Sequence, residues 1–350
     1  MFQICENGVA PWIQLNDGRQ FPALGLGTWL GLNKTGGRVE VKDEEVRQAV
    51  EWAIDAGYRQ IDTAFIYNTE EQVGKAVNNK IAEGVVKRED LFITTKLWND
   101  KHAQADVVPA LRKSLEILNL TYVDLYLIHW PVATTVRLIT RIDDPVDTMV
   151  TMPDFQRQDC GFDSRLRHTD YVDTWRGMIE ARDQGLTKSI GVSNFNVNQL
   201  DRLMAVTSLK PAVLQVEINL NLQQPALLAF CRSHNITVTG YTPFGSLFYR
   251  KASEDAPPPR VDDAALSAVA AKYKKSVPQL TLRYLHELGV VPIPKSVTKK
   301  RIKQNLDIFD FTLTPQEREM MKGYDRNYRT IPVKHWITSP YYPFEKNQDK

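Results

Sequence analysis

The sequence predicts an α/β fold, a (β/α)8 TIM barrel in which a ring of helices surrounds a closed sheet of parallel strands. Short apolar runs alternate with amphipathic stretches along the chain, and eight strand candidates can be counted. The runs LFITTKL and VDLYLIHW are apolar at nearly every position, which is typical of parallel strands covered by helices. The strand count alone also permits a doubly wound open sheet.

Length and composition narrow the class of protein. A chain of 350 residues can hold one barrel or two average domains, and the regular rhythm favours a single domain over residues 1–350. Apolar residues make up 43% and charged residues 25%, as in proteins that bury a large core. The net charge of +2 comes from scattered charges, which argues against nucleic-acid or membrane partners. We expect a small-molecule substrate, and we also expect a monomer.

The cysteines and the first residues bear on location. Cys5, Cys160 and Cys231 are widely separated and lack metal-ligand spacing, which suits reduced thiols and no bound metal. The first residues have neither a basic start nor an apolar core, so they do not resemble a secretory signal. No run approaches the length of a membrane span. These features predict a cytoplasmic protein.

The first elements are a hairpin and one β/α unit. Residues 12–15 and 19–21 flank an Asn-Asp-Gly turn, which predicts an N-terminal β-hairpin over 12–21. The strand-like LGLG follows, and then a helix led by Asp43 whose apolar residues recur at helical spacing: Val46, Ala49, Val50, Ala53 and Ile54.

The same rhythm continues to the end of the repeat. The other strand candidates are residues 58–62, 91–96, 123–129, 189–192, 213–217, 237–241 and 290–293. The helical patterns begin near Thr69, Ala103 and Tyr171 and continue at residues 197–206, 225–233, 278–288 and 299–308.

Two insertions break the rhythm, at residues 132–169 and 246–262. Both follow the ends of strands, where a closed barrel carries its substrate, so we expect them to form pocket walls. The tail at residues 326–350 ends in the aromatic run SPYYPFEK. We expect this tail to cover the same active-site face.

Candidate catalytic residues lie at the ends of three consecutive strands. Asp62, Lys96 and His129 end their strands, and Tyr67 lies in the loop after the first of them. Each alone has a structural explanation, as a helix cap, a packed ring or a buried polar group. In a barrel, however, the carboxyl ends of consecutive strands converge on one point.

Together the four suggest acid catalysis. Lys96 at an apolar strand end needs a counterion, which Asp62 can supply. The lysine cation would favour the ionised form of the Tyr67 hydroxyl and lower the pKa of this phenol, making it a general acid near neutral pH. A neutral His129 can donate a hydrogen bond to a substrate carbonyl and orient it.

The segments GYRQIDTAFIY, TTKLW, LIHWP, GVSNF, LQVEIN and IPKSVTKKRIKQN resemble the ordered signature segments of the aldo-keto reductases. The resemblance spans nearly the whole chain. It implies reduction of aldehydes and ketones to alcohols with hydride from NADPH, and it implies Asp62, Tyr67, Lys96 and His129 as the catalytic residues, with Tyr67 as the proton donor.

The resemblance also implies where NADPH or NADP+ binds. The glycines of GLGTWLG lack the spacing of a dinucleotide-binding loop, and the family holds its cofactor extended across the barrel mouth. Ser193, Asn194 and Gln215 are implied to bind the nicotinamide carboxamide, and Tyr241 to stack on its ring. The local sequence equally permits Ser193 and Asn194 to cap a helix, and Tyr241 to pack in the core.

A basic segment after the last strand is implied to bind the adenosine 2′-phosphate, which favours NADPH over NADH. Alone, KSVTKKR also fits a solvated helix face, although a helix N-terminus with nearby cations suits a phosphate. Gln304 stands where the family often has glutamate. The full set of cofactor-binding candidates is Thr28, Trp29, Ser193, Asn194, Gln215, Tyr241, Thr242, Phe244, Ser246, Lys295, Ser296, Val297, Thr298, Arg301, Gln304 and Asn305.

The resemblance places Trp29, Trp98 and Trp130 beside His129 in the substrate pocket. This set predicts an apolar slot for aldehydes or bulky ketones. The pattern is most similar to the aldose and aldehyde reductase branch. Its loops and YYPF ending resemble insect members, some of which reduce ecdysteroid ketones, so ketosteroids and lipid aldehydes are the expected substrates.

One departure from that branch concerns cofactor release. There, an aspartate in the loop after the seventh strand pairs with lysines across the bound pyrophosphate. Here YTPFGSLFYR places Phe248 at the aspartate and Leu30 stands at a lysine position, so both ends of this clasp are replaced. Glu254 or Asp255 pairing with Lys295 is the alternative that would rebuild it.

Two other classes of function stay open. A non-catalytic NADP(H)-binding sensor or structural protein is compatible with the fold, because fold does not determine function. A metal-dependent barrel hydrolase is disfavoured, because His129 has no histidine partners at ligand spacing.

Overall fold

A computed structural model of the chain describes residues 10–31, 39–135, 169–249 and 253–345. Eight parallel strands form one sheet in which each strand pairs with its neighbours in the sequence. Gly27 at the end of the first strand forms a parallel bridge with Lys295, just after the last one, and its N–H donates to Pro294 O at 3.2 Å. The sheet therefore closes into the predicted barrel, and the doubly wound alternative is wrong.

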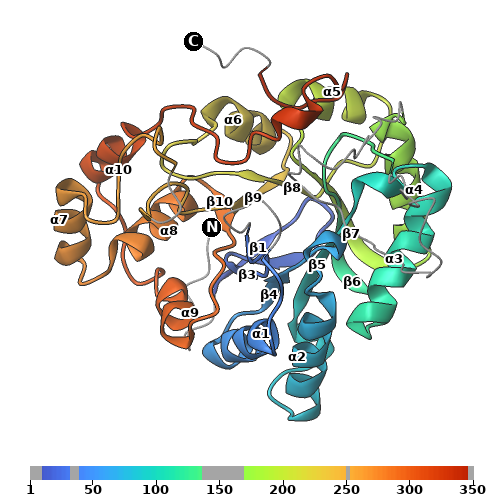
Figure 1. Cartoon of the computed structure of the whole chain (residues 1–350), viewed down its shortest axis with the longest axis horizontal. Coiled ribbons are helices and arrows are strands. Elements are labelled where there is room, and N and C mark those ends of the chain that lie inside the picture. The colour runs from blue at the N-terminus through green and yellow to red at the C-terminus, as the bar shows by residue number, and fades with distance from the viewer. Residues whose placement is uncertain (1–9, 32–38, 136–168, 250–252, 346–350) are drawn as a thin grey trace, which may run out of the picture.

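The strands lie in chain order around the barrel (Figure 1). They are β3 (Gly25–Gly27), β4 (Gln60–Asp62), β5 (Phe92–Leu97), β6 (Val123–Ile128), β7 (Thr187–Ser193), β8 (Val213–Glu217), β9 (Thr237–Tyr241) and β10 (Val290–Pro292).

Helices surround the sheet in Figure 1. They are α1 (Glu45–Ala56), α2 (Glu70–Ala82), α3 (Gln104–Leu118), α4 (Tyr171–Asp183), α5 (Val197–Ala205), α6 (Pro225–Ser233), α7 (Ala264–Lys272), α8 (Val277–Glu287), α9 (Lys299–Leu306) and α10 (Pro315–Lys322), with short 3-10 helices η1 (Phe65–Tyr67), η2 (Arg88–Asp90), η3 (Asn99–Lys101) and η4 (Lys334–Trp336). The sequence did not predict α7 and α10. No helix in the described part of the chain is long and apolar enough to cross a membrane.

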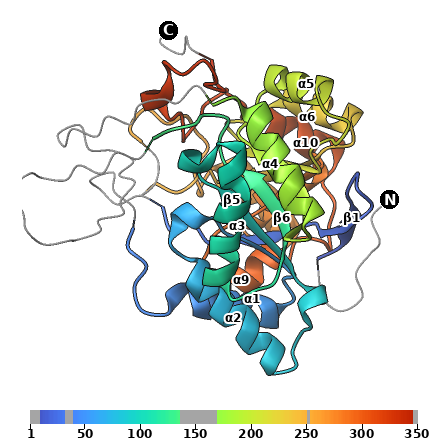
Figure 2. The same cartoon turned by 90° about the vertical axis from the view of Figure 1, so that its right-hand side faces the viewer.

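The predicted N-terminal hairpin is present and covers the amino end of the barrel. Strands β1 (Trp12–Gln14) and β2 (Gln20–Pro22) pair antiparallel. Phe21 packs edge-on against Phe92, the first residue of β5, with ring centroids 4.7 Å apart. Figure 2 shows the hairpin at one end of the barrel, beside the N label, and the C-terminal tail, in red, toward the other.

The two predicted insertions lie partly outside the described residues. Residues 136–168 of the first and 250–252 of the second are not described. In the described part of the second insertion, Asn221 Nδ2 donates to Pro258 O at 2.6 Å and Tyr328 OH contacts Ser253 Oγ at 2.6 Å. These bonds tie the second insertion to the loop after β8 and to the tail.

Gly191 in β7 lies where the barrel leaves no room for a side chain. A Cβ there would be 2.3 Å from Val213 O of β8 and 2.8 Å from the Leu127 side chain of β6. Glycine thus allows β7 to approach both neighbours and to present Ser193, two residues later, at the carboxyl end.

We expect Gly191→Ala to lower the free energy of unfolding by about 1–3 kcal/mol, because overpacking a tight interior forces the backbone to shift. Urea denaturation measures this change. Lys188→Ala, on the same strand but half-exposed, is the matched control. Equal stability of the two variants would contradict the tight contact.

Candidate active site

The three predicted strand-end residues meet at the carboxyl end of the barrel. Asp62 ends β4, Lys96 lies near the end of β5, and His129 follows β6. Their exposed fractions are 2%, 1% and 8%. Three ionisable side chains thus lie away from water, where a charge needs a partner.

Lys96 is the centre of this group. Its Nζ donates to Asp62 Oδ1 at 2.6 Å, to Thr63 O at 2.9 Å and to Tyr67 OH at 3.3 Å. The side chains of the ion pair are 0% and 3% exposed. Because these acceptors match the three N–H bonds of an ammonium group, the geometry suits a charged lysine.

Tyr67 ends the 3-10 helix η1 and lies between Trp29 and His129, with ring centroids 5.0 and 5.6 Å away. Burial, and secondarily the Asp62 carboxylate, raise the pKa of this phenol well above its ordinary value. This direction is opposite to the one expected from the lysine cation, because burial has the larger effect. Tyr67 therefore keeps its proton, and since its oxygen accepts from Lys96, its O–H can point elsewhere.

His129 is neutral in this environment. Burial, and then the Lys96 charge, hold the pKa of this imidazole well below its ordinary value. Within the described residues, Nδ1 of His129 has no hydrogen-bond partner. Trp98 lies edge-on to the ring, with centroids 5.2 Å apart. As a neutral imidazole, His129 carries one N–H group and can donate one hydrogen bond.

Several predicted cofactor residues are hydrogen-bonded to this group. Gln215 Nε2 donates to Asp62 Oδ2 at 2.7 Å, and Thr28 Oγ1 donates to Asp62 O at 3.0 Å. Asn194 Nδ2 donates to His129 O at 2.9 Å, and Tyr241 OH donates to Asn194 Oδ1 at 2.7 Å.

Ser193 and Asn194 do not cap the next helix. Asn196 does, since its side chain accepts from Gln199 N and the Gln199 side chain accepts from Asn196 N. The capping interpretation of Ser193 and Asn194 is therefore wrong. Instead, Asn194 Nδ2 also lies 3.1 Å from Ser193 Oγ, at the carboxyl end of β7.

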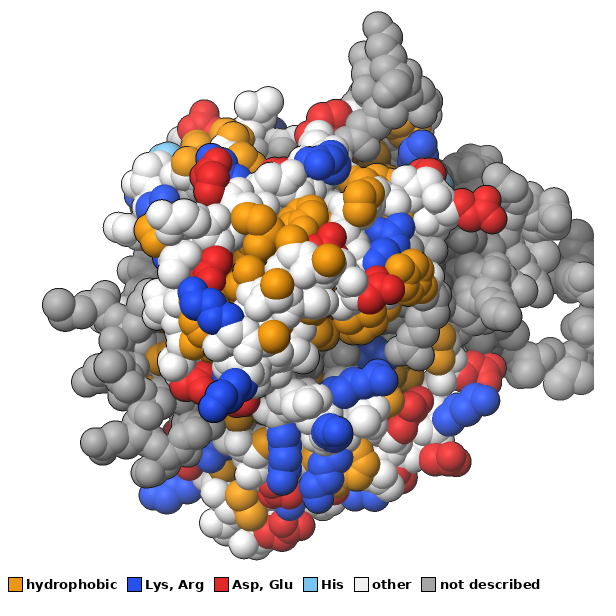
Figure 3. Space-filling view, turned by 90° about the vertical axis from the view of Figure 1, so that its left-hand side faces the viewer, with side chains coloured by type: hydrophobic (Ala, Val, Ile, Leu, Met, Phe, Trp, Pro, Cys, Tyr) orange, Lys and Arg blue, Asp and Glu red, His pale blue; other side chains and the backbone are white. Residues whose placement is uncertain are grey.

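The basic segment leads into α9 and forms its first turns. Thr298 is the N-cap residue, yet it makes no side-chain cap hydrogen bond, and no acidic residue lies in the first turn of the described helix. Helix α9 carries Lys299, Lys300, Arg301 and Lys303. Figure 3 shows Lys and Arg side chains gathered on the lower part of one face of the molecule. An uncapped helix N-terminus with nearby cations favours an anion.

The remaining cofactor candidates divide between two places. Lys295, Ser296 and Val297 line a small hollow with Gly27, Thr28 and Leu30; Gln304 is exposed and Asn305 is buried in α9. On the other side, Ser246 Oγ donates to Asn221 Oδ1 at 2.8 Å, and Thr242 and Phe244 follow β9. Trp29 contacts the Tyr67 ring.

Two residues considered for the cofactor clasp make other contacts. Phe248 packs edge-on against Phe244, with centroids 5.6 Å apart. Asp255, which the alternative paired with Lys295, lies 3.5 Å from Tyr328 OH. Asp255 thus contacts the tail.

Aromatic residues wall the space beside His129. Trp98 and Trp130 belong to one buried apolar cluster with Trp336, Val333 and Tyr342 of the tail. The Trp336 ring centroid lies 5.4 Å from that of Trp130 and 6.4 Å from that of Trp98. The sequence suggested only that the tail covers the opening. The aromatic run was the available signal, but it did not single out Trp336.

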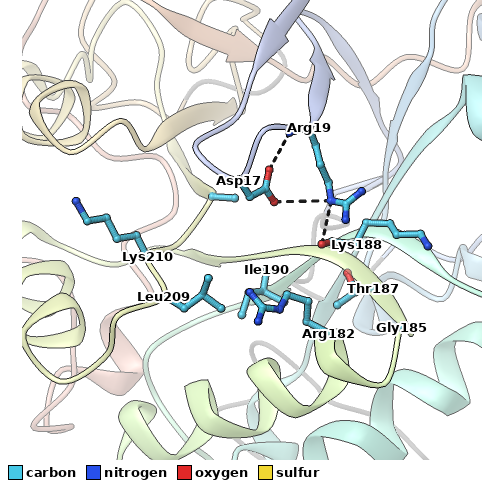
Figure 4. Close-up of a pocket in the computed structure, with 10 residues that line it drawn as sticks. Asp17, Arg19, Arg182, Gly185, Thr187, Lys188, Ile190, Leu209 and Lys210 are labelled. Atoms are coloured by element: carbon cyan, nitrogen blue, oxygen red, sulfur yellow. Dashed lines mark hydrogen bonds and ion pairs between the residues drawn. The ribbon is translucent and has the colours of Figure 1, made fainter.

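A cavity of about 340 Å³ lies at the other end of the barrel. Figure 4 shows Asp17 and Arg19 of the hairpin facing Lys188 of β7. Arg19 Nε donates to Lys188 O at 3.2 Å and lies 4.0 Å from Asp17 Oδ2. This cavity contains no residue predicted for catalysis, so it is separate from the candidate active site.

Comparison with known proteins gives concordant results. A family model described as Aldo/keto reductase family matches residues 23–326. Aldo-keto reductase AKR2E4 of Bombyx mori is 48% identical over 334 residues, covering 95% of this chain and 98% of the relative. Aldo-keto reductase family 1 member A1 of Gallus gallus is 39% identical over 349 residues, covering 95% and 97%.

Two solved structures are similar along almost their whole length. The crystal structure of Bombyx mori AKR2E4 in complex with NADP has a TM-score of 0.84 at 47% identity, covering 96% of this chain and 99% of that one. The structure of aldo-keto reductase AKR2E5 complexed with NADPH has a TM-score of 0.87 at 38% identity, covering 99% and 96%.

We expect Lys96→Met to destabilise the fold by about 3–5 kcal/mol, because it leaves the buried Asp62 carboxylate without its cation. The double variant with Asp62→Asn removes both charges and should be more stable than the single variant. Urea denaturation measures both. A double variant no more stable than the single one would contradict an ion pair at this position.

Proposed function

This chain belongs to the aldo/keto reductase family, and from that premise we propose that it reduces bulky, uncharged aldehydes and ketones to alcohols with NADPH. It is an NADP-dependent oxidoreductase. The observation that carries the proposal is the position of Lys96 Nζ, which donates to both Asp62 and Tyr67 in a buried site.

The residues present fit NADP(H). The uncapped amino end of α9 and the cations beside it suit the 2′-phosphate, with Arg301 able to bind it through two N–H groups. At the other end, Gln215 commits its amide nitrogen to Asp62, so its carbonyl oxygen is the atom that can accept from a carboxamide. When bound, the nicotinamide supplies hydride to the carbonyl carbon.

The protein's own side chains handle the proton and the orientation. Tyr67, protonated and held by Lys96, donates its proton to the substrate oxygen. Neutral His129 donates a hydrogen bond to the same oxygen and fixes the carbonyl. Lys96 stabilises the phenolate that remains after proton transfer, and Asp62 holds Lys96 in place.

The aromatic wall supports the substrate class. Trp29, Trp98 and Trp130 contact the rings of Tyr67 or His129, and Trp336 packs on Trp130. Contact with substrate is therefore chiefly apolar. Steroid ketones and lipid aldehydes fit such a surface better than hydroxylated sugars. In this proposal residues 1–350 form one catalytic domain, and the tail forms part of the substrate pocket.

We expect Tyr67→Phe to lower kcat/KM for carbonyl reduction by roughly 10²- to 10⁴-fold, because it removes the general acid. Loss of NADPH absorbance with a generic aldehyde measures the rate, and quenching of protein fluorescence measures NADPH affinity, which should be retained. Tyr273→Phe, at a distant tyrosine that donates to Glu317, is the matched control. Reduction by Tyr67→Phe near the wild-type rate would rule out the assignment. Wild-type protein that binds NADPH but reduces no carbonyl compound would instead support the sensor or structural role.

We expect Arg301→Met to weaken NADPH binding by about ten- to a hundredfold and to change NADH binding little, because it removes one charge-assisted contact to the 2′-phosphate. Titration with each cofactor measures the two affinities. Lys303→Met on the same helix is the control for a general loss of positive charge. Equal weakening of both cofactors by Arg301→Met would show that the arginine does not recognise the phosphate.

A further inference from the structure

The C-terminal tail is held at the barrel mouth by a buried carboxylate that the catalytic scheme does not use. Glu217, the last residue of β8, is 0% exposed. Its Oε1 accepts from Thr330 N at 2.9 Å and Thr330 Oγ1 at 2.6 Å, and its Oε2 accepts from Ile331 N at 3.1 Å. Asn219 Nδ2 adds a bond to Oε1 at 3.1 Å. Three of these four bonds come from the tail.

The tail is anchored a second time, at the amino end of α5. Gln199 Nε2 donates to Tyr341 O and Asn196 Nδ2 to Pro343 O, each at 2.9 Å. We name residues 329–345 between and around these anchors the strap. Trp336 lies between them and places its ring against Trp98 and Trp130. The strap is therefore a segment fixed near its two ends, with its aromatic wall in the middle.

The charge of Glu217 and the docked strap depend on each other. A carboxylate removed from water is costly unless donors surround it, and here most of the donors belong to the strap. Conversely, the Thr330 and Ile331 N–H groups find their acceptor in this one side chain. Arg329 adds positive charge near Glu217 and stacks on Phe344, with its Cζ 3.7 Å from the ring centroid.

Glu217 is also close to the reacting groups along the strand. It lies two residues after Gln215, which binds Asp62, and it pairs in register with Tyr241 of β9. The strap is therefore held by the same strands that position the catalytic residues.

We propose that Glu217 is a specificity-positioning residue: by fixing the start of the strap it holds Trp336 as the wall that binds the apolar body of bulky carbonyl substrates. This inference rests on the proposed reductase function. Glu217 does not touch the substrate and acts through the strap. Small aldehydes, which need only Tyr67 and His129, are insensitive to it.

The main test is Glu217→Gln, which keeps the size of the side chain but replaces two accepting oxygens by one oxygen and a donor. We expect KM for a bulky steroid ketone to rise about tenfold, as expected for loss of a charge-assisted hydrogen bond. With a short aliphatic aldehyde, kcat/KM should stay within about twofold of wild type. Glu217→Asp, which restores the carboxylate on a shorter stem, should recover part of the affinity for the ketone.

A double-variant cycle separates action through the strap from general damage. In a Trp336→Ala background, the wall is already absent, so adding Glu217→Gln should change KM for the ketone little further. Additive losses would overturn the proposal. Asp124→Asn is the control, because Asp124 is a half-buried carboxylate bonded to Arg88 and Ile93 near the start of β6; it should leave the ratio of the two substrates unchanged.

Hydrogen exchange gives a measurement that does not depend on turnover. In Glu217→Gln the Thr330 and Ile331 amides should exchange at least about tenfold faster than in wild type, while the helices of the barrel keep their protection. Unchanged exchange at these amides would overturn the proposal that Glu217 fixes the strap, even if activity changes. If the variant shows faster exchange but the wild type reduces no carbonyl compound, the proposed function is wrong. The contact between Glu217 and the strap would still be supported.

Discussion

The Lys96 and Asp62 ion pair is the interaction on which the rest of the carboxyl end depends. Asp62 binds Lys96 of the next strand through Oδ1 and Gln215 of β8 through Oδ2. Strands β4 and β8 are not neighbours in the sheet, so the second bond crosses the interior of the barrel. A buried carboxylate can make both contacts only when the sheet closes. The alignment of these side chains therefore depends on closure of the sheet.

The two ends of the barrel differ in the residues that fill and cover them. At the amino end Leu15 and Phe21 of the hairpin pack on Phe92 and Val291 and close the interior with apolar groups. At the carboxyl end the interior is polar and is covered by aromatic rings of loops and tail. This division lets stability rest on one end, while the other keeps the charged groups that chemistry requires.

The sequence predicted the barrel and the four converging residues because both depend on local pattern and on strand order. It missed α7, because the run AALSAVAAK has no polar face to mark a helix period. It also missed α10, although the capping box of Thr314 and Glu317 was a usable signal there. The contacts of Trp336 with Trp98 and Trp130 join distant parts of the chain through an irregular tail. No periodicity encodes such a contact. The depth of burial of Tyr67, which decides the direction in which its pKa shifts, is likewise a property of the assembled pocket.

Burial changes the role that Lys96 plays toward Tyr67. Burial raises the pKa of Tyr67 and lowers those of Lys96 and His129. The Asp62 carboxylate opposes the effect of burial on Lys96, so in the proposed mechanism the phenol begins the reaction with its proton beside a lysine cation. A cation 3.3 Å from the phenol oxygen has little to stabilise while that oxygen is neutral. It interacts strongly once negative charge develops during proton transfer. In the proposed mechanism Lys96 therefore contributes mainly to the transition state, where an interaction accelerates the reaction. The same burial that keeps Tyr67 protonated would strengthen that contribution by lowering the local dielectric.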